Sequence, residues 1–352
     1  MEILFAYEKP AEGAQFIART DESARLVKCV KNKKKAVIYG SPRTGKTSLV
    51  RNALQTLKKS GYRDLVITLD LFNIRSKTQF LEILSRELLP VFDRYNILSP
   101  LPLDIDTEHI SDNMLMDLPD MMAQHFGLNI VVYFKEFQNI LSFEQGDKFM
   151  EDYAAVLRKH SAVSYIFCGS CINRMKYIFN EACNFGSDIE KIYLGAIDRR
   201  PFTNYIISTF QRTGRVIEQE MAEEIYDFCK GHPWYTQHFA SICYDSTIGY
   251  INQNVITHAR ESLIYVHDST FREIMRDLTN NQVNFLMAVN EKVTRFCSAD
   301  ILEQYNLISS AHVARVRDSL LKKEIITMDD DGNVSLIDPL FEYWLKYYYF
   351  IE

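Results

Sequence analysis

Gly40-Ser41-Pro42-Arg43-Thr44-Gly45-Lys46-Thr47-Ser48 is the stretch of sequence that decides the fold. It fits the pattern G-x-x-x-x-G-K-[ST], in which glycines let the backbone turn so that successive N–H groups point at phosphate oxygens. The apolar residues 36–39 before it are typical of a buried strand, and apolar residues recur at helical spacing from 49 to 57 after it. A loop between a strand and a helix is the context that this motif requires, so the stretch predicts a P-loop.

The residue types of this loop predict its ligands. The Lys46 ammonium would reach the β- and γ-phosphates of ATP, and the Thr47 hydroxyl would bind Mg²⁺. The helix that begins near Lys46 would add the positive end of its dipole. We therefore expect residues 40–48 to bind ATP with Mg²⁺. The alternative, an incidental glycine-rich turn, is disfavoured because both flanks fit the motif.

Composition limits the class of protein. The chain has 352 residues, which suggests two or three domains, and its 47% hydrophobic and 24% charged residues are typical of a globular protein. No segment is apolar over the length that a bilayer requires, and residues 1–8 lack the basic and apolar regions of an export signal. We therefore expect a cytoplasmic protein without a membrane partner. The net charge of −6 disfavours a general nucleic-acid coat but allows one local basic face.

The cysteines predict reduced thiols. There are seven of them, an odd number scattered over the chain, which does not suggest a disulfide framework. Cys168 and Cys171 form a single C-x-x-C. We interpret this pair as incidental, because no second Cys or His pair stands at the spacing of a zinc site.

Alternating strands and helices are expected as far as about residue 200. Apolar segments predict further strands over residues 64–70, 129–134, 163–168 and 189–194. Helices are expected over 80–89, where Pro90 should end the pattern, and within 104–126. This order predicts an α/β fold with an open parallel sheet and helices on both faces, and its ligand would bind at the carboxyl ends of the strands.

Two short polar segments follow the third and fourth of these strands. They are Lys135-Glu136-Phe137-Gln138 and Gly169-Ser170. In a P-loop nucleoside triphosphatase, an apolar strand that ends in two acidic residues places the first near the Mg²⁺ shell and the second where it can activate water. Glu136 holds the second place, whereas Lys135 holds the first.

The remainder of the chain predicts a helical lid and a winged helix. Three helices are expected from residue 201, followed by a connecting helix over 258–277. Three more helices, a hairpin over 325–337 and a final helix that starts at Asp338-Pro339 make a winged helix. The third helix of this group would present His312, Arg315, Ser319 and Lys322 on its outer face. The predicted domains are an ATP-binding core over 1–200, a lid over 201–275 and a winged-helix domain over 276–352.

These features resemble those of the archaeal-type AAA+ ATPases within the STAND group of P-loop NTPases, and the resemblance covers nearly the whole chain. Six features match in order, beginning with Phe16-Ile17-Ala18-Arg19, the P-loop, Lys135-Glu136-Phe137-Gln138 and Gly169-Ser170. The last two are Gly231-His232-Pro233-Trp234-Tyr235, for the family's Gly-x-Pro signature, and Asp338-Pro339-Leu340-Phe341-Glu342-Tyr343-Trp344.

The resemblance implies an ATP site between the sheet and a helical lid. Arg19 would lie near adenine, Ser170 would sense the γ-phosphate, and His232-Pro233 would report the nucleotide state from the lid. The expected catalytic residues are Glu136, Lys46 and Ser170. Without the signature, His232 would be interpreted as a turn residue.

Three positions depart from the family pattern. Ala18 replaces a glycine, and Gly186-Ser187 replaces a Gly-Arg pair, so an expected arginine is missing. Lys135 replaces the aspartate that ends the third strand. Arg174, Arg199 and Arg200 lie near enough in sequence to replace the missing arginine, although a plain surface charge is the simpler interpretation for each.

Two functions follow from these residues. The first is an ATPase that converts ATP to ADP and phosphate and acts as a switch on a macromolecular partner, with slow hydrolysis because of Lys135. The alternative is a non-hydrolysing module in which nucleotide is a structural ligand and the winged helix docks DNA or protein. We favour a protein partner or self-association over DNA binding through Arg315 and Lys322, because the turn Asp329-Asp330-Asp331 would repel phosphates.

Overall fold

The computed structural model describes residues 4–186 and 188–351. Ser187, part of the departure from the family's Gly-Arg pair, lies outside the described residues, as do the first three residues of the N-terminal segment. The chain forms two compact units. An α/β unit comprises residues 19–42 and 46–194 without 187, and a helical unit comprises residues 4–18, 43–45 and 195–351.

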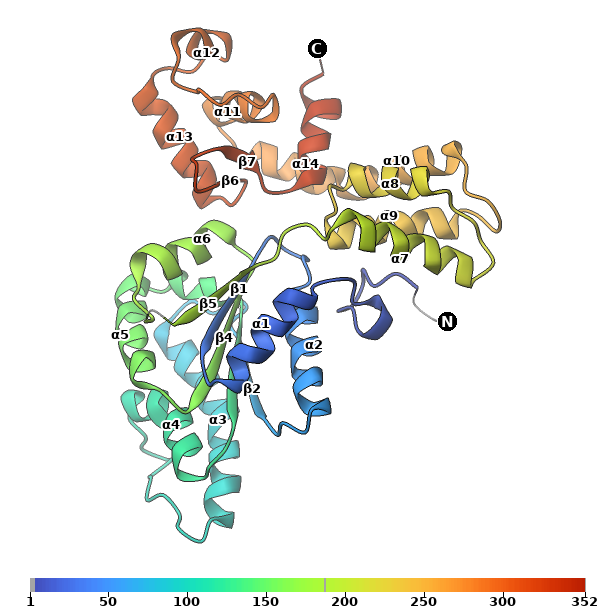
Figure 1. Ribbon diagram of the computed structural model, residues 1–352. Helices are drawn as coiled ribbons and strands as arrows, with labels where there is room; N and C mark the ends of the chain where they lie inside the picture. The colour runs from blue at the N-terminus through green and yellow to red at the C-terminus, as the bar shows by residue number, and fades with distance from the viewer. Residues whose placement is uncertain (1–3, 187, 352) are drawn as a thin grey trace. The chain divides into compact units, whose positions relative to one another are not determined.

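A five-stranded parallel sheet with the order β2-β3-β4-β1-β5 is the centre of the α/β unit (Figure 1). Its strands are β1 (Lys35–Tyr39), β2 (Leu65–Asp70), β3 (Ile130–Lys135), β4 (Val163–Gly169) and β5 (Ile189–Tyr193). The expectation of an open parallel sheet is therefore confirmed. Because the strands are parallel, their carboxyl ends meet at one edge, where the P-loop, Glu136 and Ser170 follow.

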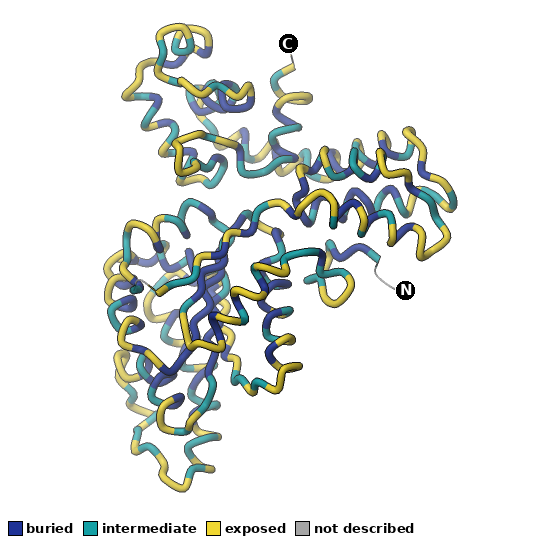
Figure 2. Tube along the Cα trace, viewed as in Figure 1, coloured by how far each residue is buried: buried dark blue, intermediate teal, exposed yellow. Residues whose placement is uncertain are grey.

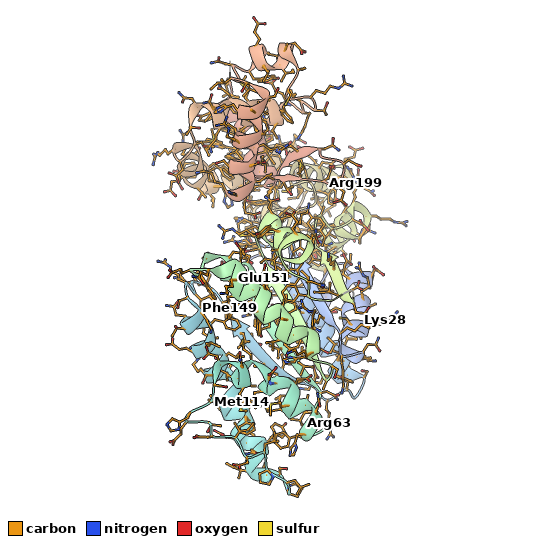
Figure 3. The ribbon with its side chains drawn as sticks, turned by 90° about the vertical axis from the view of Figure 1, so that its left-hand side faces the viewer. Lys28, Arg63, Met114, Phe149, Glu151 and Arg199 are labelled. Carbon is orange, nitrogen blue, oxygen red and sulfur yellow. The ribbon has the colours of Figure 1, made fainter. Side chains whose placement is uncertain are left out.

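Helices cover both faces of this sheet. They are α1 (Thr20–Lys31), α2 (Lys46–Lys59), α3 (Lys77–Leu98), α4 (Asp112–His125), α5 (Gly146–Lys159) and α6 (Ile172–Lys176). In Figure 3, α5 with Phe149 and Glu151 lies toward the viewer, and α1 with Lys28 lies at the right-hand side of the sheet. The central strand β4 is buried at every residue, which its apolar sequence requires (Figure 2).

The expectation that Pro90 ends a helix is wrong. Helix α3 runs through Pro90, and α4 likewise runs through Pro119. A proline inside a helix removes one backbone hydrogen bond and costs roughly 3 kcal/mol. Leu84, Leu88 and Phe92 are fully buried in the core on the same helix, and this burial outweighs the loss.

The helical unit contains the predicted lid and winged helix. Its elements are α7 (Arg199–Arg212), α8 (Gln219–Phe228), α9 (Pro233–Asp245), α10 (Gln253–Arg276), α11 (Asn280–Asn290), α12 (Ala299–Gln304), α13 (Ser310–Lys322), β6 (Ile326–Met328), β7 (Val334–Leu336) and α14 (Pro339–Trp344). One hydrophobic core runs through α7–α10 and the winged helix. The N-terminal segment packs on this unit, since the Tyr205 hydroxyl donates to the Leu4 carbonyl and the Trp234 indole donates to the Tyr7 carbonyl.

The outer face of α13 differs from expectation at Ser319. Its hydroxyl accepts a hydrogen bond from the Gln282 amide of α11 at 2.9 Å, so this side chain faces inward. The reason is helical geometry, because position 319 lies one turn after the buried Val316 and so borders the buried face of α13. Arg315 and Lys322 are exposed, as predicted.

Among the described residues, no helix has both the length and the apolar character that crossing a membrane requires.

Candidate nucleotide-binding site

The P-loop joins β1 to α2 and has unusual backbone angles at two positions. Gly45 has a φ of +93° and Arg43 a φ of +63°, both in the region that favours glycine. Gly40 is not among the described residues of positive φ. The glycine requirement therefore comes from the backbone at Gly45, where an added Cβ would meet no atom within 4 Å.

The Lys46 ammonium lies inside the loop. It donates hydrogen bonds to the carbonyl oxygens of Gly40 at 2.9 Å and Ser41 at 2.7 Å, and the residue is only 8% exposed. Burial lowers the pKa of this lysine, and the nearby Glu136 carboxylate opposes that change. A cation held by neutral carbonyls at the start of a helix can exchange those partners for phosphate oxygens.

A cavity of about 210 Å³ opens beside Lys46. Its lining residues come from the start of α2 and from the carboxyl ends of three strands: Lys46, Thr47, Asp70, Phe72, Tyr133, Lys135, Glu136 and Cys168. Cys168 is a free thiol, and burial raises its pKa to about 12, so it stays neutral. The cavity therefore contains two ammonium groups and hydroxyl groups, which can bind phosphate oxygens, together with the carboxylates of Asp70 and Glu136.

Glu136 is held in a strained conformation at the end of β3. Its φ of +51° is uncommon for a residue with a side chain and costs of order 1–3 kcal/mol. Its Oε2 accepts hydrogen bonds from the Ser170 hydroxyl at 2.5 Å and from the Gln138 amide at 2.7 Å. The structure thus brings the predicted base and the predicted γ-phosphate sensor together.

Lys135 is paired with a carboxylate from the neighbouring strand. Parallel pairing places Asp70 of β2 opposite Lys135 of β3, and the Lys135 ammonium lies 3.3 Å from Asp70 Oδ2. The other oxygen, Oδ1, accepts the backbone N–H of Phe72 at 3.1 Å. The strand ends therefore carry an ion pair inside the cavity.

Four residues of the cavity were missed by sequence reasoning: Asp70, Phe72, Tyr133 and Cys168. Tyr133 lines the cavity together with Thr47 and Cys168, and burial raises the pKa of its hydroxyl well above the usual range. Asp70 was recognised only as the end of a strand. Its position at the carboxyl end of a parallel strand was the available signal, whereas Tyr133 has none in the sequence because alternate residues of a fully buried strand look alike.

Three other predicted residues, Arg19, Arg199 and Ser48, are not among those that line this cavity. Arg19 precedes α1 with a φ of +60° and is paired with Glu22 at 2.9 Å. In the helical unit, Arg199 forms an ion pair with Asp227, which agrees with the simpler interpretation of a surface charge. Ser48 is buried in the first turn of α2.

His232 and Pro233 begin α9 in the helical unit. The His232 ring accepts a hydrogen bond from the Tyr235 N–H at 3.4 Å, and Pro233 takes the first helical turn. In the same unit the Arg43 guanidinium lies 3.9 Å from the centre of the Trp234 ring. These residues therefore belong to the start of α9, and their link to nucleotide remains a prediction.

The donor set fits a phosphate chain better than a resident Mg²⁺ ion. Nucleotide-bound Mg²⁺ usually takes one or two carboxylates together with phosphates and water. Here Asp70 accepts from Lys135 and Phe72, Glu136 accepts from two side chains, and a lysine ammonium occupies the same cavity. Over residues 4–186 and 188–351, no group of three or more His, Cys, Asp or Glu side chains could hold a metal.

Comparison with known proteins gives one family match, over the C-terminal part. A model described as a probable winged helix domain matches residues 269–347. A search of the curated proteins gives no match.

The chain is similar to several solved structures along most of its length. The Walker-type ATPase of Pyrococcus abyssi has a TM-score of 0.72 and 16% identity, over 98% of this chain and 100% of that chain. The Aeropyrum pernix ORC2 protein, in ADPNP and ADP complexes, has a TM-score of 0.59 and 15% identity, over 92% and 90%. Cdc6p from Pyrobaculum aerophilum has a TM-score of 0.50 and 12% identity, over 96% and 94%. The chain therefore has the fold of an AAA+ P-loop ATPase with a C-terminal winged helix domain.

Proposed function

We propose that this chain binds ATP in the cavity beside the P-loop and acts as a nucleotide-dependent switch on a macromolecular partner. The observation that carries the proposal is the position of Lys46, whose buried ammonium lies on the loop carbonyls beside a cavity lined by Thr47 and Glu136. ATP would accept the N–H groups of the loop and the Lys46 ammonium through its phosphates.

Hydrolysis of ATP to ADP and phosphate would use Glu136 as the base that orients water. Ser170 and Gln138 hold one carboxylate oxygen of Glu136, so the side chain is fixed toward the cavity before the nucleotide arrives. The Ser170 hydroxyl donates to the same carboxylate. A γ-phosphate that accepted this hydroxyl instead would therefore remove one hydrogen bond from Glu136 and change its position.

Lys135 makes slow turnover the expected result. The ammonium stands where a second carboxylate would orient the reacting groups, and one well-placed electrostatic group is worth roughly 10²–10³ in rate. Binding does not depend on that carboxylate, because the loop backbone and Lys46 provide most of the contacts. If Lys135 removes turnover entirely, the chain has the alternative function, a module that binds ATP without hydrolysing it.

The helical unit supports the role of a switch. Glu342 of α14 accepts hydrogen bonds from Lys230, which follows α8, and Lys292, which follows α11. These contacts and the shared hydrophobic core join the lid helices to the winged helix, so a nucleotide that biases the lid would also bias the winged helix. This arrangement, with the order of the motifs, supports membership of the STAND group.

A protein partner, or a second copy of the chain, suits the winged helix better than DNA. On the exposed face of α13, Arg315 and Lys322 are accompanied by Asp318, and the turn between β6 and β7 carries Asp329, Asp330 and Asp331. These carboxylates would repel phosphates. A salt titration of DNA affinity tests this: a slope that shrinks on Arg315→Ala would establish phosphate contact and contradict the preference for protein.

Calorimetric ATP binding and phosphate release together test the main proposal. Lys46→Ala should abolish binding, whereas Lys58→Ala on the exposed side of the same helix should not. Glu136→Gln should bind ATP but lose turnover, and Lys135→Asp should increase turnover by about 10²-fold. Wild-type protein without ATP affinity would refute the proposal. Equal turnover in wild type, Glu136→Gln and Lys135→Asp would leave only the non-hydrolysing module.

A further inference from the structure

Two lysines share the cavity beside the P-loop. Lys46 comes from the start of α2 and Lys135 from the end of β3, and both line the same space with Thr47. In P-loop sites, positive charge must balance the phosphates, and the divalent cation usually supplies a large part of it. A second lysine in this position provides a permanent positive charge from the protein itself.

The position of Lys135 is determined by the sheet. Its partner Asp70 stands opposite it in the parallel pairing of β3 with β2, and the ammonium lies 3.3 Å from Asp70 Oδ2. Asp70 is fixed in turn by the backbone N–H of Phe72. The Lys135 side chain is 35% exposed, so a ligand in the cavity can reach it without displacing a core residue.

The charges of the cavity favour a metal-free anion. Lys46 and Lys135 balance Asp70 and Glu136, so the four side chains have no net formal charge. With an aspartate in place of Lys135, the same four positions would carry two net negative charges and would repel a triphosphate without a divalent cation. Lys135 removes this repulsion.

We propose that this site binds nucleoside triphosphate without a divalent cation, because the Lys135 ammonium provides the balancing charge. The inference rests on the proposed function, since it specifies the form in which ATP occupies the same cavity. Lys135 would release Asp70 Oδ2 in whole or in part and turn toward the phosphates. ATP binding then becomes independent of Mg²⁺, while hydrolysis remains slow for the reason given above.

A competing interpretation assigns the metal to Asp70. In that case the carboxylate has moved from the end of β3 to the end of β2, and Lys135 only orients it. Both carboxylate oxygens of Asp70 already accept hydrogen bonds, which disfavours this interpretation. The proposal predicts that ATP affinity does not depend on Mg²⁺, whereas the competing interpretation predicts that it does, so one measurement separates them.

The experiment is calorimetric titration of the full chain with ATP, once with excess Mg²⁺ and once with EDTA. The wild-type dissociation constant should change by no more than about threefold between the two conditions. Lys135→Asp should bind ATP with Mg²⁺ but lose about tenfold or more in EDTA. Lys135→Met, which keeps the length of the side chain without its charge, should lie between them.

A matched control separates local from overall charge. Lys148→Asp changes the net charge equally, but the residue is exposed in the first turn of α5 and does not line the cavity. It should behave as wild type in both conditions. If wild type weakens in EDTA as much as Lys135→Asp does, the inference is wrong and the proposed ATP site stands. If wild type binds ATP in neither condition, the proposed function itself fails. The wild-type comparison also decides the matter should Lys135→Asp not fold.

Discussion

The Tyr235 hydroxyl donates a hydrogen bond to Asp338 Oδ2 at 2.6 Å and so joins α9 to the start of α14. The other oxygen of Asp338 caps α14, because Oδ1 accepts the N–H groups of Leu340 at 2.8 Å and Phe341 at 3.1 Å. Tyr235 and Asp338 belong to the two C-terminal sequence signatures. One carboxylate therefore connects the helix that begins with His232-Pro233 to the last helix of the winged helix.

This connection predicts the effect of Tyr235→Phe. The variant leaves a half-buried carboxylate oxygen without its donor, which typically costs about 1–3 kcal/mol of unfolding free energy. Both tryptophans of the chain, Trp234 and Trp344, lie in this helical unit, so urea unfolding followed by tryptophan fluorescence reports on it. Asp338→Asn keeps a capping side chain and should cost less than Asp338→Ala. Equal stability of Tyr235→Phe and wild type would show that the contact contributes nothing.

The sequence predicts the parts of the fold that depend on local pattern. All five strands lie within about one residue of their expected positions, because each is a short apolar run between turns. The P-loop was found by its motif, and Glu136 by its position after the third predicted strand. Pro90 was misjudged because a single-residue rule competes with burial, which depends on the tertiary structure.

Contacts between neighbouring strands were beyond sequence reasoning. The pairing of Lys135 with Asp70 follows from the parallel register of β2 and β3, which no spacing along the chain reveals. Tyr133 was missed because both faces of β3 are buried, so its place in the lining of the cavity could not be inferred. Ser319 was placed on the wrong face because the side of α13 that contacts other elements is wider than its row of apolar residues and includes this serine.

Gly169→Ala is predicted to disturb the cavity through Gln138, which holds the Glu136 carboxylate. A Cβ at this residue would lie 2.3 Å from Met175 Sδ and 2.6 Å from Gln138 Oε1, and overpacking of this kind costs about 1–3 kcal/mol. Because Gln138 donates to Glu136, displacement of Gln138 should also lower turnover. Thermal unfolding and phosphate release measure the two effects.

A second substitution tests the cause assigned to Gly169→Ala. Met175→Ala removes the atoms that the new Cβ would strike, so the double variant should be more stable than the sum of the single changes predicts. Additive losses would show that the two side chains do not clash. Because the new Cβ would still meet Gln138 Oε1, recovery of turnover should be incomplete.

Asp120 is predicted to be one of the most sensitive positions of the α/β unit. Its buried carboxylate accepts the N–H groups of Ser161 at 3.0 Å and Ala162 at 2.8 Å, and the Gln124 amide at 2.6 Å. Asp120→Ala leaves these donors unpaired, and each buried unpaired group costs about 1–3 kcal/mol. Circular dichroism during urea unfolding should show a loss of about 2–4 kcal/mol. Asp120→Asn keeps an acceptor oxygen and should lose less; equal losses would mean that packing, not hydrogen bonding, is responsible.

His238 should make the helical unit less stable in acid. Burial lowers the pKa of this histidine to about 4, and the nearby His267 and Arg43 act in the same direction. Its ring is stacked on Tyr7 with centroids 4.5 Å apart. In the unfolded chain His238 takes up a proton as the pH falls below its ordinary pKa of 6.5. In the folded chain it takes up the proton only near pH 4. The stabilising contribution is therefore complete above pH 6.5 and is lost as the pH falls toward 4.

The measurement is the unfolding free energy at pH 7 and pH 5, followed by tryptophan fluorescence. Between these values wild type should lose about 1 kcal/mol more than His238→Gln, after allowance for partial solvent screening. The variant is less stable at pH 7 because it loses the ring contact with Tyr7, so the two stability curves should converge in acid. His258→Gln, at an exposed position on α10, should keep the wild-type slope. Parallel curves for wild type and His238→Gln would mean that His238 is protonated as easily in the folded chain as in the unfolded one.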